Sequence, residues 1–168
     1  MFLKRSFVIA LSFFMAMFIA ACGSYTTTAG GPYGGSSSST VIQTATVTVK
    51  GQSEMVLTDA QGMTLYYFTV DSATQSTCSS SCAQMWHPLL FTGSGGPSSS
   101  TPLAGKLSVK MDANGSQIEY NGHPLYTFSG DTAPGQTNGE DLFGMWFVVT
   151  PNLAVQGGGS TNGGGYGY

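Results

Sequence analysis

The chain has 168 residues and a formal net charge of −3, and only 8% of its residues are charged, well below the usual quarter. Five lysines and arginines are too few to build the basic surface that phosphate recognition needs, which excludes nucleic acid as a partner. Polar surface must come from Ser, Thr, Gly and Asn instead, as suits an extracytoplasmic β-protein with uncharged turns.

The N-terminus has the pattern of a secretory signal. A short basic region, Lys4-Arg5, precedes an almost unbroken apolar run that is too short and too N-terminal for a comfortable spanning helix. The segment I-A-A-C, ending at Cys22, resembles the bacterial lipobox, which implies cleavage before Cys22 and lipid on its sulfur. We expect residues 1–21 to be a lipoprotein signal peptide. The alternative is an ordinary signal peptide with an incidental cysteine.

Two low-complexity segments flank the expected domain. Residues 22–40 are rich in Gly, Ser and Thr and cannot bury enough apolar surface to fold, so we interpret them as a flexible tether. The Gly-rich residues 156–168 are interpreted as a disordered tail. A single small domain is left, spanning residues 41–155.

The chain repeats itself at an offset of 60 residues, without a gap. L-Y-Y-F at 65–68 matches L-Y-T-F at 125–128, and an aspartate follows each motif at the same distance. Met-Trp also recurs, at 85–86 and 145–146. Because chance would not place these motifs in one register, we interpret residues 46–91 and 106–151 as two copies of one unit of about 45 residues. Two copies are too few for an open solenoid, so we expect them to share one core.

The second copy shows the expected strands most clearly. Leu107, Val109 and Met111 alternate with polar residues, which predicts a half-buried strand with these three side chains facing inward. Asn121-Gly122 predicts a tight turn between strands over 116–120 and 123–128. The β-forming run M-W-F-V-V-T, at 145–150, predicts the last strand.

The first copy follows the same plan, with strands over 55–58, 63–69 and 86–91. No long stretch has a helical period, and residues 78–85 allow at most one helical turn. We therefore expect an all-β fold, a small antiparallel β domain made of two copies of a β-meander.

Three features together resemble the bacterial secreted-repeat lipoproteins named for a Tyr-x-aromatic-x-x-Asp motif. The motif occurs at Tyr66–Asp71 and at Tyr126–Asp131, and C-x-x-x-C-A-x-x-W and N-G-x-P-L-Y are similar to family segments. The resemblance implies secretion, lipidation and duplication, and it brings no biochemical activity with it. His87 stands where the family usually has the first of two prolines after the tryptophan.

The segment C-S-S-S-C-A-Q-M-W-H allows three interpretations. Cys78 and Cys82 form an even pair in an oxidising compartment, which favours a disulfide that closes a short loop. The same pair could be a redox-active dithiol. The third interpretation is a copper site, because Cys, Met and His are the ligands that copper prefers, here with Met85 and His87. Met85 has a repeat partner in a copy without cysteines, which instead favours a core position beside Trp86.

The paired motifs also have two interpretations. As a binding surface, they would present aromatic faces and one carboxylate per copy, from residues Tyr66, Phe68, Asp71, Trp86, Tyr126, Phe128, Asp131 and Trp146. As structure, the aromatic side chains fill the core, while Asp71 and Asp131 accept hydrogen bonds from backbone N–H groups of the following turn. The structural interpretation is the one we favour.

No nucleophile–base arrangement, phosphate loop or paired-histidine zinc motif occurs, so we expect neither an enzyme nor a bound cofactor. We expect a non-catalytic binding or structural module, anchored by lipid on the extracytoplasmic side of a bacterial envelope. Its partners would be the membrane, through that lipid, and an unknown envelope protein or small ligand. The alternative is a redox or copper/haem-associated envelope protein that uses Cys78, Cys82, Met85 and His87.

Overall fold

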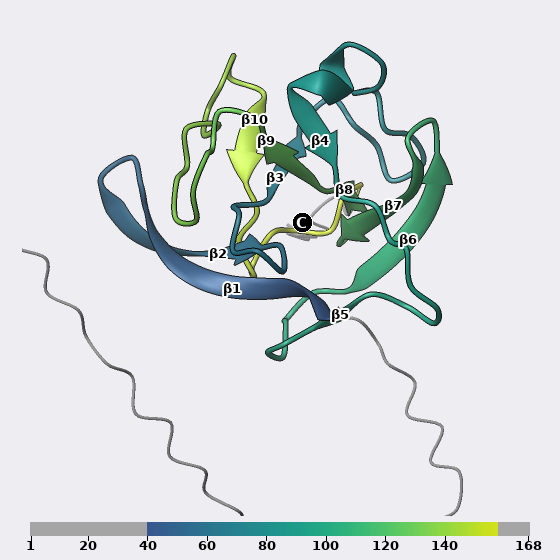
Figure 1. The fold of residues 1–168 in the computed structure, drawn as a ribbon, viewed down its shortest axis with the longest axis horizontal. Helices are drawn as coiled ribbons and strands as arrows, with labels where there is room; N and C mark the ends of the chain where they lie inside the picture. Colours follow the sequence, from purple (N-terminus) through teal and green to yellow (C-terminus); the bar gives the residue numbers. More distant parts are fainter. Residues whose placement is uncertain (1–39, 158–168) are drawn as a thin grey trace, which may run out of the picture. The chain divides into compact units, whose positions relative to one another are not determined.

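A computed structural model describes residues 40–157, and Figure 1 shows that they form strands and one short 3-10 turn, η1. The expected signal peptide, Cys22, the tether up to residue 39 and the tail from residue 158 lie outside the described residues. Within the described part, no helix is long and apolar enough to cross a membrane. The elements are β1 Thr40–Val49, β2 Gln52–Thr58, β3 Tyr66–Phe68, η1 Cys82–Gln84, β4 Trp86–Pro88, β5 Ser98–Ser99, β6 Leu107–Asp112, β7 Gly115–Tyr120, β8 His123–Pro124, β9 Tyr126–Phe128 and β10 Trp146–Val148.

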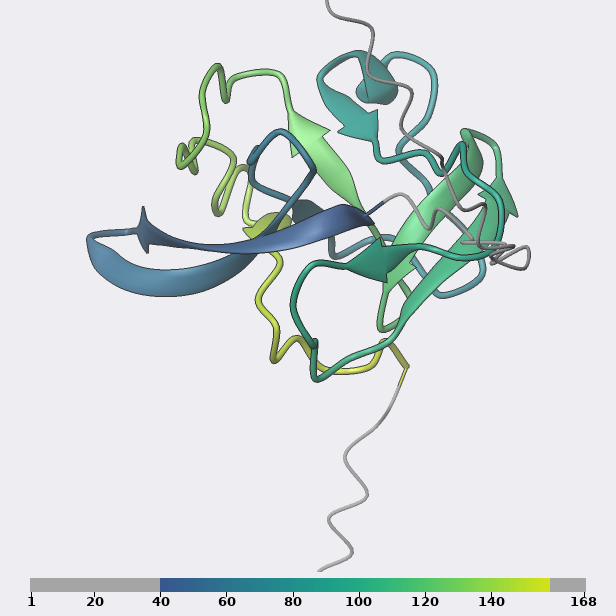
Figure 2. The same ribbon diagram turned by 60° about the horizontal axis from the view of Figure 1, so that its bottom comes forward.

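The strands form three sheets, in the orders β2-β1-β5, β10-β3-β9-β4 and β6-β7-β8. All pairs are antiparallel except β1 with β5, which confirms the all-β antiparallel fold class. The turn end of the β1–β2 hairpin extends beyond the other strands, as Figure 2 shows. Side chains at this end of β2, from Gln52 to Met55, are exposed.

Two-residue turns close the hairpins where the sequence favours them. Asn121 and Gly122 both have positive φ, 52° and 83°, and join Tyr120 directly to its partner His123. This pair of left-handed conformations is typical of the turns that match strand twist, so the turn prediction is confirmed. Lys50 and Gly51, with φ of 48° and 81°, close the β1–β2 hairpin in the same way.

The central four-stranded sheet is assembled from both copies. β4, from the first copy, pairs with β9 of the second, and β10, from the second copy, pairs with β3 of the first. The two motif strands, β3 and β9, meet in the middle with Tyr66 opposite Tyr126. Each tryptophan strand therefore finds its hydrogen-bonding partner in the other copy.

Backbone hydrogen bonds between the copies continue beyond the sheet. They also show that the alignment offset between the two copies is not 60 residues everywhere. The backbone of Leu57 bonds to Leu65 and Val149, as the backbone of Ile118 bonds to Leu125 and Leu89. Leu65 and Val149 match Leu125 and Leu89 at the offset of 60, whereas Leu57 matches Ile118 at 61. The gap-free alignment is thus wrong by one residue in this hairpin.

The extra residue lies in the turn after Leu57. There the carboxylate of Asp59 accepts hydrogen bonds from the backbone N–H groups of Gln61 and Met63, at 2.9 and 2.8 Å. A side chain that bonds its own turn in this way stabilises a longer connection. The second copy uses the shorter Asn121-Gly122 turn instead.

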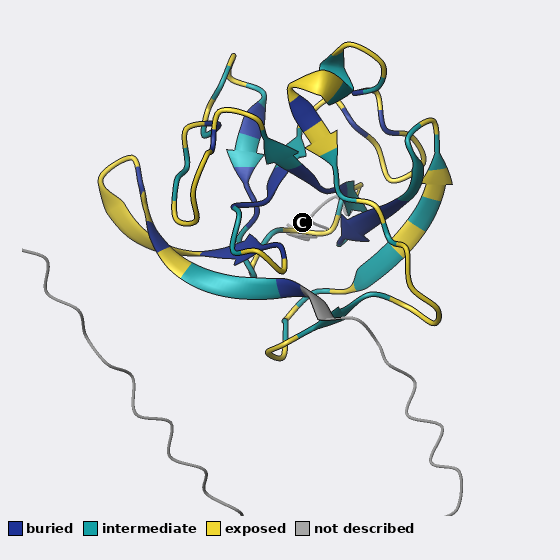
Figure 3. Ribbon diagram, viewed as in Figure 1, coloured by how far each residue is buried: buried dark blue, intermediate teal, exposed yellow. Residues whose placement is uncertain are grey.

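Apolar side chains gather in two clusters, as expected from alternation along the motif strands. Tyr66, Phe68, Tyr126 and Phe128 belong to one cluster, with both tryptophans, and Leu65, Tyr67 and Leu125 belong to the other. The buried segments in Figure 3 run through the central strands, and most connecting loops are exposed. The expectation that the two copies would share a core is met by both clusters, since each contains residues from both halves.

β6 departs from the prediction at two of its three apolar positions, since only Leu107 packs against the core. Val109 and Met111 are exposed, Met111 to 73%, whereas Ser108 and Lys110 are half-buried. The half-buried polar side chains have partners on both sides: the Lys110 ammonium donates to the carbonyl of Ala73 in the first copy's loop, and the Ser108 hydroxyl donates to Glu119 on the neighbouring β7. The alternation was right, but hydrophobicity alone assigned Val109 and Met111 to the wrong environment.

Candidate functional site

The two repeated motifs meet through a reciprocal pair of hydrogen bonds. The Tyr66 hydroxyl donates to Oδ2 of Asp131, and the Tyr126 hydroxyl donates to Oδ2 of Asp71, each at 2.6 Å. Each tyrosine therefore bonds the aspartate of the other copy. This exchange is the relation expected across a two-fold axis, where residue i contacts j and j contacts i.

Burial makes these contacts strong. Both tyrosines have no exposed surface, and Asp71 and Asp131 are only 5% and 6% exposed. Burial raises the pKa of the Tyr66 hydroxyl, and its hydrogen bond to Asp131 raises that pKa further; burial and Asp71 do the same for Tyr126. Both phenols therefore stay protonated and donate charge-assisted hydrogen bonds, which are about twice as strong as neutral ones.

The second carboxylate oxygen of each aspartate holds the loop that follows its own motif. Oδ1 of Asp71 accepts from the backbone N–H and the hydroxyl of Thr77, both at 2.7 Å. Oδ1 of Asp131 accepts from the backbone N–H of Asn138 at 2.9 Å. Each aspartate thus ties its own loop to the other copy's motif strand.

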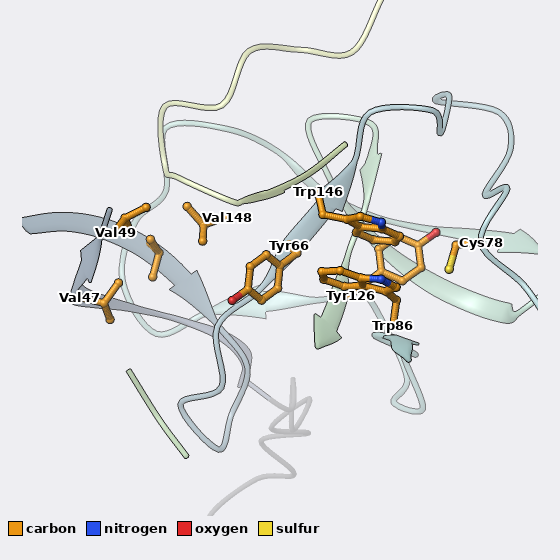
Figure 4. Close-up of a cluster of buried hydrophobic side chains, with 9 residues drawn as sticks. Val47, Val49, Tyr66, Cys78, Trp86, Tyr126, Trp146 and Val148 are labelled. Carbon is orange, nitrogen blue, oxygen red and sulfur yellow. The ribbon is translucent and has the colours of Figure 1, made fainter. Parts of the chain in front are cut away.

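The tryptophans complete the junction between the copies. Figure 4 shows the indoles of Trp86 and Trp146 face to face, with ring centroids 3.7 Å apart and an interplanar angle of 3°. Phe68 stacks on Trp146, and Phe128 lies against Trp86, at 4.3 and 4.4 Å. The four rings form one stack with a contribution from every strand of the central sheet, and both tryptophans are 2% exposed.

The interpretation of the paired motifs as an exposed binding surface therefore does not fit the position of these residues. The tyrosines, aspartates and tryptophans of the motifs are buried, and the two phenylalanines are half-buried against the same cluster. Alternation puts these side chains on the inner face of the sheet, where the other copy covers them. The repeated residues form the contact between the copies, as in the structural interpretation, although the aspartates bond the opposite copy as well as their own loop.

Cys78 and Cys82 form a disulfide, with Cα atoms 5.2 Å apart. Cys78 is fully buried beside the aromatic cluster, Cys82 is half-buried, and η1 begins at Cys82. In this form neither sulfur is a thiolate, so neither has the charge that metal ligation or nucleophilic exchange requires.

Met85 and His87, the other two residues of the copper interpretation, are both exposed. Met85 ends η1 and is 45% exposed, contrary to the expected core position, while Trp86, the first residue of β4, is the one that is buried. His87 is exposed too, and its Nε2 lies 3.0 Å from the carbonyl of Gln84. Residues 40–157 contain no group of three or more His, Cys, Asp and Glu side chains placed to hold a metal.

Sequence reasoning missed a polar network that joins the copies beneath the disulfide. The side-chain amide of Asn114, in the β6–β7 turn, donates to the carbonyl of Cys78 and to the side chains of Ser76 and Gln117 at 3.0–3.1 Å. Gln117 has no exposed surface and donates to the carbonyl of Leu125. Ser76 lies 2.5 Å from the Tyr126 hydroxyl. The sequence predicts only a turn at Asn114, and no sequence pattern marks Gln117 as a buried residue.

The described surface carries two shallow hollows. The larger, about 450 Å³, is lined by the Ser-rich connection between the copies, from Pro97 to Leu107. The smaller, about 250 Å³, lies between Ala73, the Asn121-Gly122 turn and Gln156. Gln156 was expected in the tail. Its backbone N–H donates to the carbonyl of Asn121 and its side-chain amide donates to the carbonyl of Asp71, so the ordered contacts of the domain continue to this residue.

Residues 47–90 and 108–150 each match the model of one protein family, described as a secreted repeat of unknown function. The chain belongs to this family. The two matched segments fall within the two copies recognised from the sequence, so the resemblance to the secreted repeats is confirmed. Family membership indicates an extracytoplasmic module, located outside the cell or in its envelope. No curated protein and no solved structure shows significant similarity to the chain.

The junction between the copies, made of the motif tyrosines, aspartates, phenylalanines and tryptophans, is the centre of the secreted repeat. Each copy contributes a tyrosine, an aspartate, a phenylalanine and a tryptophan, and each of these side chains completes a contact with its counterpart copy. Chemically, the arrangement binds two half-domains to each other. All four oxygens of the two motif carboxylates accept hydrogen bonds within the protein.

Proposed function

We propose that this secreted-repeat protein is a lipid-anchored extracytoplasmic lipoprotein whose domain is a non-catalytic binding or structural module of the bacterial envelope. The observation that carries the proposal is the use of the motif residues. The side chains that define the repeat join the two copies to each other, and both aspartates accept hydrogen bonds inside the protein. Such residues maintain a scaffold, and any partner must be met by the surface around it.

Lipid anchoring is proposed from the segment I-A-A-C at residues 19–22. A thioether-linked diacylglycerol on Cys22 with a further acyl chain would give firm attachment, where a single chain is marginal. The Gly/Ser/Thr-rich stretch after Cys22 would then act as a flexible spacer between lipid and domain. The membrane is the first partner in this proposal, and an envelope protein or a small ligand is the second.

The test is metabolic labelling of the full-length chain and of Cys22→Ala in a bacterial host, using an alkyne fatty acid. We expect label on the wild type, recovery in the membrane fraction, and an N-terminal peptide that starts at an acylated Cys22. Cys22→Ala should lose the label and the membrane association, while its thermal unfolding remains that of the wild-type domain. An unlabelled wild-type chain, found in the soluble fraction, would overturn the lipid anchor.

The non-catalytic role has a separate test, in the paired variant Asp71→Asn/Asp131→Asn. If the carboxylates serve the scaffold, this variant should unfold at a lower temperature. A variant of undiminished stability would remove the structural role on which the proposal rests.

A further inference from the structure

The central sheet contains no tryptophan strand paired within its own copy. β4 bonds β9, and β10 bonds β3, so the partner always comes from the other half of the chain. The backbone bonds of Leu89 and Val149 cross between the halves in the same way. What each copy keeps to itself is a hairpin, β1–β2 in one half and β6–β7 with β8 in the other. Neither half pairs its own tryptophan strand, and each leaves its motif strand without the neighbours it has in the central sheet, so neither half is complete without a partner.

The contacts across the junction are also self-complementary. Tyr66 bonds Asp131 while Tyr126 bonds Asp71, and one tryptophan from each half stacks on the other. These reciprocal contacts are those of an isologous dimer, in which the same patch serves both partners. Here the two partners are covalently linked parts of one chain.

The covalent link takes little part in the junction. Residues 92–96, T-G-S-G-G, are all exposed. The following segment touches the first copy through the two-position pairing of β5 with β1, one backbone bond from Ser100 to Ile42, and a 3.4 Å contact between the hydroxyls of Thr44 and Thr101. Its Leu103 packs against the second apolar cluster, away from the tyrosine–aspartate bonds and the tryptophan stack. The junction itself therefore does not depend on which chain supplies the connection.

We propose that the partner of this protein includes a second copy of itself, and that two chains associate by exchanging halves. In the dimer, the first copy of each chain joins the second copy of the other, with the same sheet, the same tyrosine–aspartate bonds and the same tryptophan stack. Exchange of an identical element is a low-cost route to a dimer, because only the connecting segment changes conformation. The monomer keeps the advantage of a tethered partner, at an effective concentration of roughly millimolar, so dimers form when the protein folds at high concentration.

The test uses the full chain with a specific protease site in place of Gly93–Gly96, in unlabelled and isotope-labelled forms. The two forms are unfolded together, refolded over a range of concentrations, and separated by size. We expect a dimer fraction that grows with concentration. Cleavage of the mixed dimer at the new site should release half-pairs that contain one labelled and one unlabelled half by native mass spectrometry. The monomer fraction should release pairs of one label.

Two results would overturn the proposal. One is a chain that refolds as monomer at every concentration. The other is a dimer that on cleavage keeps labelled halves with labelled halves, which would mean association through an outer surface. Should the cleaved halves separate, the refolded dimer is lightly cross-linked before cleavage, and the label content of the cross-linked half-pairs gives the second reading; the first is made on the uncleaved chain by its mass.

A pair of variants identifies the interface. Tyr66→Phe/Tyr126→Phe removes both hydrogen bonds between the halves, so cleaved half-pairs should dissociate at least about tenfold more readily. Tyr120→Phe is the matched control: Tyr120 is equally buried, but its hydroxyl donates to Pro151 in the same half. It should lower stability without changing the affinity between halves. Equal effects of the two variants would contradict the proposed interface.

Discussion

The two copies share the junction but secure the loop before the tryptophan strand by different means. In the first copy Cys78 and Cys82 close the loop as a disulfide, while the aligned positions in the second copy are Asn138 and Leu142. Asn138 donates its side-chain amide to the carbonyl of Gly130, and Leu142 packs against the aromatic cluster. The cross-copy contacts are thus kept in both halves, whereas the local fastening of the loop is interchangeable.

The loop before the tryptophan strand of the second copy has further side-chain contacts and two residues in the left-handed backbone conformation. Asp141 accepts from the ammonium of Lys50 at 2.6 Å, and the carboxylate of Glu140 accepts from the backbone N–H of Val148. Asp141 and Phe143 both have positive φ, near 60°. Such conformations are costly outside glycine and persist where surrounding contacts hold them. The first copy's loop is thus closed by a disulfide, whereas the second copy's loop is held by hydrogen bonds made by the side chains of Asn138, Glu140 and Asp141.

The largest expected effect comes from the part that the copies share. Trp86→Ala and Trp146→Ala should each lower the free energy of unfolding by about 3–5 kcal/mol, because each removes half of the same stack. The two losses should be similar, and urea unfolding followed by circular dichroism measures both. Phe143→Ala, which truncates a side chain that is 71% exposed, is the control and should change little. A large difference between the tryptophans would show that the junction is not symmetric.

A smaller effect should separate the copies. A Cβ at Gly139 would lie 2.7 Å from the Trp86 ring and 3.0 Å from the Tyr66 ring, whereas the aligned Ser79 already carries one. Gly139→Ala should therefore cost about 1–3 kcal/mol through overpacking, and Ser79→Ala within about 0.5 kcal/mol. Chemical denaturation of both variants checks the difference. Equal costs would mean that the two loops meet the stack in the same way.

Reduction of the disulfide should affect only the first copy. Opening so short a loop should lower stability by about 2 kcal/mol in the chain-entropy model, with the fold retained because Asp71 still anchors the loop. Thermal unfolding with and without a reductant measures the shift. In Cys78→Ala/Cys82→Ala the reductant should have no effect, and loss of the whole fold on reduction would contradict the supporting role assigned here.

The smallest expected effect depends on pH. Glu119 is buried where the first copy has Thr58, and burial raises the pKa of its carboxyl above the ordinary 4.5. A raised pKa means that the folded protein binds more protons, so this residue's contribution to stability falls as pH rises from about 4.5 through the folded value. Glu119→Gln should remove that slope and gain stability relative to wild type at neutral pH. Unfolding midpoints of both proteins across this pH range measure the slope. Identical slopes in the wild type and in Glu119→Gln would mean that another group causes the pH dependence.

Local and repeated features of this protein were predictable from the sequence, whereas contacts between distant segments were not. The Asn121-Gly122 turn, the alternation of the motif strands and the pairing of Cys78 with Cys82 depend on a few neighbouring residues. The exchange of tryptophan strands depends on which of two equivalent motif strands each one joins. Because the copies are nearly identical there, pairing within a copy and pairing between copies have the same sequence pattern.

Two particular failures have a physical origin. β6 alternates correctly, but Val109 and Met111 are exposed while Ser108 and Lys110 are half-buried, because both polar side chains find partners there: Glu119 of the same copy for Ser108, and the other copy's Ala73 for Lys110. Met85 was assigned to the core through its alignment with Met145, which is half-buried. Alignment transfers backbone position between copies, while exposure is set by the different loops packed on each side.

The measurement that tests the central claim most directly is a set of four double-mutant cycles on the motif residues, with tyrosine to Phe and aspartate to Asn. The account predicts coupling of about 1–3 kcal/mol for the cross-copy pairs, Tyr66 with Asp131 and Tyr126 with Asp71. It predicts markedly weaker coupling for the same-copy pairs, Tyr66 with Asp71 and Tyr126 with Asp131. Strong coupling within each copy, and little between copies, would contradict the reciprocal junction.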